Sequence, residues 1–296
     1  MTALDPRRLF RRLAGEIPRQ LRRHVLIVGS LAAAYHFRAQ LERRAVNTKD
    51  ADVVVHPAGD VGSSGAIARK LLALGWTRTP ECFPMPRPAP AARLRALRLY
   101  PPGSRDYFIE LLGLPGRAQP KPLVWTPVRL PDGWYGVGSH RYLGLTAHGR
   151  LRSAEGLDYA SPAMMALSNL LSHPRVGPER MSAPVEGLRL RRSAKDLGRV
   201  LALAWLAGRE ETAPWPAEWE LGLRACFPRR WRALARGAGS GLRELLDDGP
   251  VLEEARVTTE VGLLSGRGVT AQGLRATGLR LLADALVPLA ERALQP

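Results

Sequence analysis

Two aspartates, Asp50 and Asp52, stand two positions apart at the start of an apolar stretch that continues to Val55. The β-branched residues of this stretch predict a strand over residues 48–55. Because side chains alternate between the two faces of a strand, both carboxylates are expected on one face. Like charges this close repel each other unless a cation lies between them, and Mg²⁺ prefers carboxylate and phosphate oxygens. The pair therefore predicts a Mg²⁺ site for phosphoryl-transfer chemistry, and the alternative is a pair of solvent-facing aspartates at a strand end.

A second chemical feature is the Gly29-Ser30 dipeptide. It follows the apolar segment His24–Val28, which predicts a strand, and precedes an alanine-rich stretch over residues 31–44, which predicts a helix. The free backbone amides and the dipole at a helix N-terminus both favour an anion. We therefore expect Gly29 and Ser30 to bind phosphate oxygens, with an ordinary turn as the alternative.

The elements that must position these residues divide the chain into two parts. Residues 1–23 predict a basic amphipathic helix, residues 59–65 (GDVGSSG) a loop, residues 66–74 a helix, and residues 94–100 and 107–112 further strands. From Ser161 onward the pattern is helical. We expect an α/β domain over residues 1–155 and a helical domain over residues 156–296.

The charge of the chain predicts a polyanionic partner. The 44 basic and 27 acidic residues give a formal net charge of +17, which is typical of proteins that bind nucleic acid. Only four of the basic residues are lysines. A biased genome composition also produces such an arginine excess, so that origin remains an alternative explanation of the charge.

The cysteine content and hydropathy indicate a compartment. Two cysteines, Cys82 and Cys226, are too few for a disulfide framework, and no apolar run is long enough to cross a membrane. We expect a cytoplasmic protein with no membrane partner.

The motifs VLIVGSLAAAYHF and TKDADVVV together resemble the signature of the nucleotidyltransferase superfamily, which has the DNA polymerase β-like fold. RAVNTKDADVVV is similar to the motif of the AbiEii-type nucleotidyltransferases, the toxin components of toxin–antitoxin pairs. The resemblance implies an α/β domain with a mixed sheet, followed by a mostly helical domain. It also implies Mg²⁺-dependent transfer of a nucleotide from an NTP to an acceptor such as the 3′ end of a tRNA, and a cognate antitoxin as partner.

The resemblance implies further site residues. Glu110, in the apolar strand YFIELL, matches the family's third carboxylate; it would join Asp50 and Asp52 on the metal and deprotonate the acceptor hydroxyl. Asp106 is the second choice, and a solvent-facing glutamate on an edge strand is the alternative. Lys195 and Asp196 match a Lys-Asp pair that orients nucleotide and acceptor. Lys49 also directly precedes a motif aspartate and is expected to bind substrate.

Three positions differ from the family pattern. Ser168 and Asn169 stand where a lysine is expected, and Arg199 replaces an acidic residue. Arg191 and Arg192 are expected to bind substrate phosphates instead. An RNA acceptor also predicts a cluster of basic residues beside the active cleft, formed by Arg189, Arg191, Arg192 and Lys195 and by Arg229, Arg230 and Arg232. Two alternatives follow: a catalytically weakened member that serves as an RNA- or protein-binding module, or a nucleotidyltransferase acting on a protein or small molecule.

Overall fold

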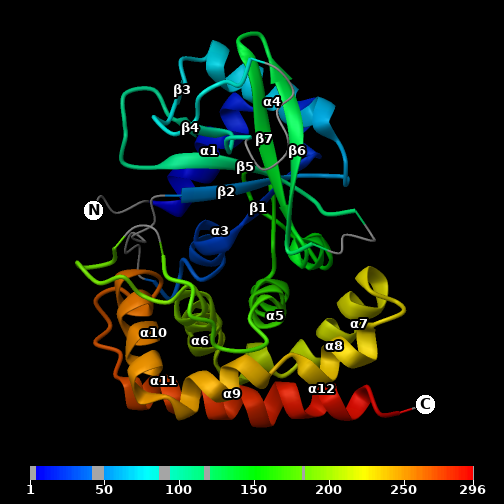
Figure 1. The fold of residues 1–296 in the computed structure, drawn as a ribbon, viewed down its shortest axis with the longest axis vertical. Coiled ribbons are helices and arrows are strands. Elements are labelled where there is room, and N and C mark those ends of the chain that lie inside the picture. The colour runs from blue at the N-terminus through cyan, green and yellow to red at the C-terminus, as the bar shows by residue number, and fades with distance from the viewer. Residues whose placement is uncertain (1–4, 42–49, 87–93, 117–120, 182–183, 296) are drawn as a thin grey trace. The chain divides into compact units, whose positions relative to one another are not determined.

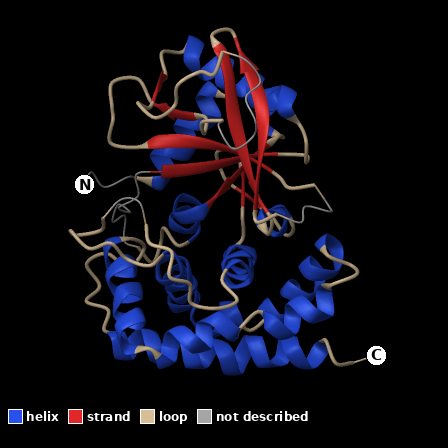
Figure 2. Ribbon diagram, in the orientation of Figure 1, coloured by secondary structure: helices blue, strands red, loops and turns tan. Residues whose placement is uncertain are grey.

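The structure is a computed structural model that describes residues 5–41, 50–86, 94–116, 121–181 and 184–295. The chain forms two compact units, of which the first comprises Met1–Arg38 with Arg43–Ala160 and the second Ala39–Glu42 with Ser161–Pro296. The first unit contains a mixed sheet with helices, and the second is helical (Figures 1 and 2). The expected fold class, an α/β region with a mixed sheet followed by a helical region, is confirmed at this level.

The sheet of the first unit has its two motif strands near its centre. The strand order is β3-β4-β5-β2-β1-β9-β8, and the β6–β7 hairpin joins through β7 to β5. β2 pairs with β1 in antiparallel and with β5 in parallel orientation, so the sheet is mixed. The described strands are β1 (Val25–Val28), β2 (Asp50–Val55), β3 (Thr77–Arg78), β4 (Arg98–Tyr100), β5 (Phe108–Gly113), β6 (Leu123–Leu130), β7 (Gly133–His140), β8 (Leu151–Arg152) and β9 (Asp158–Tyr159).

Helices of the first unit pack on this sheet through apolar side chains. α3 contacts β1 and β2, α1 contacts α3, and α4 contacts β5 and β6. α1 buries Leu9, Phe10 and Leu13, which are spaced as one face of a helix. The described helices are α1 (Pro6–Glu16), α2 (Arg19–Arg22), α3 (Gly29–His36), α4 (Val61–Ala73) and the 3₁₀ helix η2 (Leu143–Ala147).

Two predicted helix boundaries were wrong. The helix expected to continue to Arg44 ends at His36, where α3 stops. The GDVGSSG segment was expected to be a loop, but α4 begins at Val61 within it. The side chain of Asp60 accepts a hydrogen bond from the Ser63 backbone N–H at 2.9 Å, and such an N-cap stabilises a helix start despite the glycines that follow.

The second unit is built around α6, whose backbone is kinked at Gly208. α6 contacts α5, α9, α10 and α11, and Leu197, Leu201 and Ala204 of α6 are fully buried. No helix in the described part of the chain is long and apolar enough to cross a membrane. The described helices are α5 (Pro162–Ser172), α6 (Arg192–Thr212), α7 (Trp215–Cys226), α8 (Trp231–Gly237), α9 (Ser240–Asp247), α10 (Gly249–Val261), α11 (Ala271–Leu281), the π-helix η3 (Leu282–Leu286) and α12 (Val287–Arg292).

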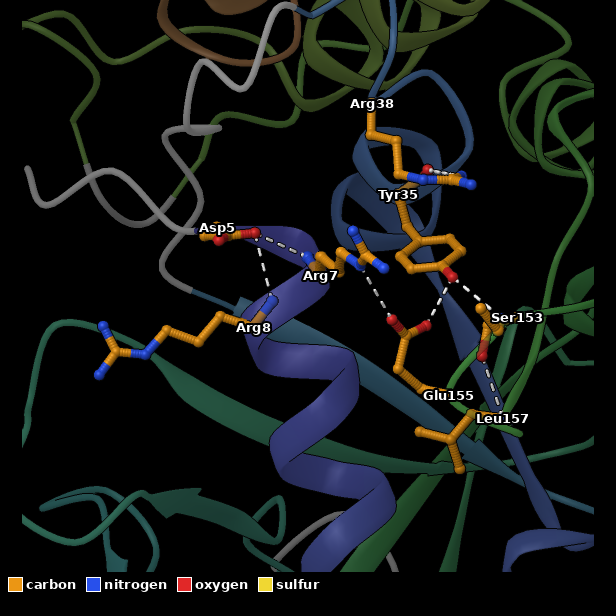
Figure 3. Close-up of polar contacts among 9 residues, drawn as sticks. Asp5, Arg7, Arg8, Tyr35, Arg38, Ser153, Glu155 and Leu157 are labelled. Carbon is orange, nitrogen blue, oxygen red and sulfur yellow. Dashed lines mark hydrogen bonds and ion pairs between the residues drawn. The ribbon is translucent and has the colours of Figure 1, made fainter.

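A cluster of polar side chains links α3 to α1 and to the turn between β8 and β9 in the first unit (Figure 3). The hydroxyl of Tyr35 in α3 donates to Glu155 at 2.5 Å and accepts from the Ala154 backbone N–H at 3.1 Å. Arg7 of α1 reaches the same Glu155 carboxylate at 3.4 Å. Phe10 stacks on the Tyr35 ring with 4.1 Å between centroids. Burial and the Glu155 carboxylate raise the pKa of Tyr35. One tyrosine thus joins α3, α1 and the turn between β8 and β9.

Replacing Tyr35 with phenylalanine should weaken this attachment. The Ala154 N–H and the Glu155 carboxylate would each lose a buried partner, which costs about 1–3 kcal/mol. We expect Tyr35→Phe to lower the free energy of unfolding by that amount in urea titrations. Tyr100→Phe is the matched control, because the Tyr100 hydroxyl forms no hydrogen bond with another described residue. Equal effects of the two substitutions would show that the cluster does not stabilise the unit.

Candidate functional site

Asp50 and Asp52 lie on the same face of β2. Burial alternates along the strand: Ala51 and Val53 are fully buried, whereas the two aspartates are half-buried. This is the alternation that a strand with one core-facing side produces. The opposite, apolar side of β2 is therefore in the core, and both carboxylates lie on the less buried side.

A row of charged side chains crosses the sheet from Asp52. In the parallel pairing of β2 with β5, Asp52 is the register partner of Glu110. In the antiparallel pairing of β5 with β4, Glu110 is the register partner of Arg98. Residues directly opposite each other on neighbouring strands point to the same face. Asp52, Glu110 and Arg98 consequently form one charged row, and Asp50 precedes it on the same face.

The other neighbour of Asp52 is the junction between β1 and α3. Val28, the last residue of β1, is the register partner of Asp52, and Gly29 follows with a φ of +72°. A Cβ atom at Gly29 would lie 2.6 Å from Oδ2 of Asp52. This residue must therefore be glycine on two counts: the left-handed backbone and the close approach of the carboxylate.

The Gly29-Ser30 junction also starts α3 without a capping side chain. The first amide N–H groups of a helix have no partner within the helix, and they attract anions. The carboxylate of Asp52 lies against this same backbone, so donors for a phosphate and ligands for a cation occur together. That combination suits a Mg²⁺–triphosphate, in which anionic oxygens and the cation bind at adjacent points.

Glu110 lies on the expected face but has a cationic partner. Its Oε2 is 2.7 Å from Nε of Arg98, and only 15% of its side chain is exposed. The Arg98 guanidinium also lies over the Phe108 ring, 5.4 Å from the centroid. Among the described residues, no group of three or more His, Cys, Asp and Glu side chains could hold a metal. Glu110 as a metal ligand or base stays a prediction.

The remaining donor set still fits Mg²⁺. This ion is commonly bound by one or two carboxylates together with substrate phosphates and water, and not by a full protein cage. Asp50 and Asp52 provide two carboxylates, and the start of α3 provides amides for the phosphates. Lys49, which the sequence predicts to bind substrate, lies outside the described residues.

In the second unit, Asp196 joins the end of α5 to the start of α6. Its Oδ2 lies 2.9 Å from Nε2 of His173, the residue that follows α5, and Oδ1 lies 4.0 Å from Arg199. Burial would raise the pKa of Asp196, but the His173 hydrogen bond and the charges of Arg199 and Lys195 outweigh it and lower the pKa to about 2. Asp196 is thus held as a carboxylate between the end of α5 and the start of α6.

His173 was not among the predicted site residues. No local sequence signal indicates its role, because its partner Asp196 lies 23 residues further along the chain. Lys195 precedes Asp196 in the first turns of α6 and is half-buried.

Arg191 and Arg192 differ in their surroundings. Glu254 of α10 accepts hydrogen bonds from both the backbone N–H and the guanidinium of Arg191, each at 2.7 Å. Arg192 is exposed, with Glu179 at 3.8 Å. An acidic side chain therefore offsets the charge of Arg191, and Arg192 is the more accessible of the two predicted phosphate ligands.

The first unit thus brings together Gly29, Ser30, Asp50 and Asp52, with Glu110 one strand away. Searches against protein-family models, characterised proteins and solved structures found no match to this chain. The resemblance to nucleotidyltransferases consequently remains a prediction from the motifs, and the geometry around Gly29 and Asp52 is the independent support for it.

The pKa of Asp196 predicts how stability depends on pH. A carboxyl whose folded pKa lies below its usual value of 3.8 stabilises the fold at higher pH, and this contribution is lost as pH falls from about 4 to about 2. The shift corresponds to about 2 kcal/mol. We expect Asp196→Asn to lower the free energy of unfolding by that amount at pH 7, and the difference from the parent to shrink as pH falls towards 2.

Urea titrations across this pH range measure the effect. Asp247→Asn is the control, because Asp247 is 77% exposed and 3.9 Å from Arg275, and such surface pairs contribute little. A difference between Asp196→Asn and the parent that does not change with pH would contradict the ion-pair account.

Proposed function

We propose that this protein is a Mg²⁺-dependent nucleotidyltransferase that transfers a nucleotide from an NTP to an RNA acceptor such as a tRNA 3′ end. The observation that carries the proposal is the contact between Asp52 and Gly29 at the start of α3. It joins a carboxylate pair to a helix N-terminus, which are the two features needed to bind a metal–triphosphate. The net charge of +17 favours a polyanionic acceptor.

In this proposal Asp50 and Asp52 hold the metal, which neutralises phosphate charge when bound. The backbone amides of Gly29 and Ser30 and the Ser30 hydroxyl donate to triphosphate oxygens. The acceptor oxygen forms a bond to the α-phosphorus, the bond to pyrophosphate breaks, and Glu110 accepts the hydroxyl proton. Arg98 holds the Glu110 carboxylate in its place on the sheet.

Lys195 of the second unit belongs to the proposal through the resemblance alone. Its side chain forms no hydrogen bond or ion pair with another residue that the structure describes. Asp196, at the start of α6, contacts His173, and its expected role in orienting nucleotide and acceptor stays a prediction from the resemblance. The proposal also includes a cognate antitoxin protein, which only the resemblance to the AbiEii-type toxins supports.

A binding module without catalysis is the second candidate. The ion pair between Glu110 and Arg98 favours it, because the guanidinium already occupies the carboxylate that would contact a metal or the acceptor. The presence of Ser168 and Asn169 where a lysine is expected also favours the binding module. In that case the chain would bind RNA or a protein without transferring a nucleotide.

Label transfer separates these two functions. Full-length protein is incubated with Mg²⁺, unfractionated tRNA and each α-labelled NTP, and label in RNA is measured. We expect transfer by the parent, and Asp52→Asn to lower its rate at least about 100-fold, since even changes outside the ligand shell of a metal cost 10–100-fold. Glu81→Gln is the matched control, because it removes one exposed negative charge from the same unit.

Unchanged transfer by Asp52→Asn would remove the aspartate pair from the mechanism. RNA binding by the parent without transfer from any NTP would favour the binding module.

A further inference from the structure

Six arginines in the second unit are exposed along a stretch that contains no acid. No aspartate or glutamate occurs between Glu220 and Glu244. The arginines in this stretch lie on α7, α8 and α9 and in the α7–α8 connection, and every one of them is exposed. We call them the α7–α9 arginine surface: Arg224, Arg229, Arg230, Arg232, Arg236 and Arg243.

Little negative charge offsets this surface. Glu220 is shared between Arg224, at 2.7 Å, and Arg292, at 3.3 Å, so two cations already neutralise it. Glu244 accepts a hydrogen bond from the Val176 backbone N–H. By contrast, acidic side chains offset the positive charges of Arg191 and Arg192: Glu254 pairs with Arg191, and Glu179 lies near Arg192.

Several guanidinium groups of the surface are also free of internal contacts. The side chains of Arg229, Arg230 and Arg236 form no hydrogen bond or ion pair with any residue that the structure describes. An exposed arginine without a partner presents up to five N–H donors. Their fork geometry matches phosphate oxygens, which they bind in pairs.

At the centre of the surface, two of the arginines stack on the ring of Trp231. Trp231 is 7% exposed, and the guanidinium carbons of Arg224 and Arg232 lie 4.2 and 4.9 Å from its ring centroid. Stacking on an aromatic ring holds a guanidinium in one plane and leaves its edge donors outward. Arg236 follows Arg232 by four residues on α8, so the two lie on the same side of the helix.

A small hollow adjoins the arginines. It has a volume of about 160 Å³ and lies between α8, α9 and α12, and its lining residues include Arg236, Ser240, Arg243 and one acid, Glu291. Pockets for whole small ligands measure about 300–1,000 Å³. The hollow is therefore too small for a free nucleotide and has room for part of a polymer backbone.

We propose that the α7–α9 arginine surface binds the phosphate backbone of single-stranded RNA. The role of this RNA as acceptor rests on the proposed function, whereas the binding itself does not. RNA is favoured over an acidic membrane because Trp231, the aromatic residue at the centre of the surface, is buried and does not insert into lipid. The planar guanidinium groups also match phosphate oxygens better than they match the flexible carboxylates of an acidic peptide.

Charge removal at matched positions tests this proposal. The test variant carries Arg229→Gln, Arg230→Gln and Arg236→Gln. The control carries Arg8→Gln, Arg11→Gln and Arg19→Gln, which remove the same charge from exposed arginines of α1 and α2. Binding of a fluorescein-labelled 20-nucleotide RNA of mixed sequence is measured by anisotropy from 50 to 200 mM salt.

We expect the test variant to bind at least about tenfold more weakly at low salt. Its log–log salt slope should be less steep by about 2, since each single-strand phosphate contact contributes about 0.7. The control should stay within about twofold of the parent. Equal losses in the two variants would overturn the proposal, as would parental binding by the test variant, or binding of labelled polyglutamate as tight as that of RNA.

Repeating the titration with Asp52→Asn separates this proposal from the proposed function. RNA binding that persists in Asp52→Asn and is lost in the test variant supports the docking surface, even where the parent transfers no label. Where the parent does transfer label, the test variant should raise KM for RNA with little change in kcat. An unchanged KM would contradict docking at this surface.

Discussion

The contact between the Gly29 backbone and the Asp52 carboxylate is the constraint on which the site depends. A Cβ atom at residue 29 would lie within 2.6 Å of Oδ2 of Asp52, so any other residue would push the carboxylate away from the start of α3. The left-handed φ of Gly29 turns the chain directly from β1 into α3. One glycine thus sets both the direction of α3 and the distance between its first amides and the Asp52 carboxylate.

Pairing of strands and packing of α3 maintain this contact. β2 lies between β1 and β5, which fixes the register of Asp52 against Val28 on one side and Glu110 on the other. The Tyr35 hydroxyl connects α3 to the turn between β8 and β9 through two hydrogen bonds. Displacement of either element would separate the carboxylates from the Gly29-Ser30 amides, so the geometry of the candidate site depends on the stability of the first unit.

Local patterns predicted part of this arrangement. The spacing of Asp50 and Asp52 predicted their common face, because alternation along a strand depends only on neighbouring residues. The start of α4 could not be predicted as easily, since the Asp60 cap outweighs the low helix propensity of the glycines in GDVGSSG. The ion pair between Arg98 and Glu110 depends on the pairing of β4 with β5. His173, which contacts Asp196, and Glu254, which contacts Arg191, likewise lie far from their partners along the chain, and no local pattern indicates them.

In the proposed function, Asp50 and Asp52 hold a metal beside the start of α3. Anomalous X-ray diffraction tests it most directly, on crystals of the full chain grown with Mn²⁺ and a non-hydrolysable NTP analogue. We predict an anomalous peak about 2.1 Å from carboxylate oxygens of both aspartates, the distance typical of Mg²⁺ sites, with the triphosphate against the Gly29-Ser30 amides. A bound analogue whose Mn²⁺ lies away from both aspartates would contradict the account.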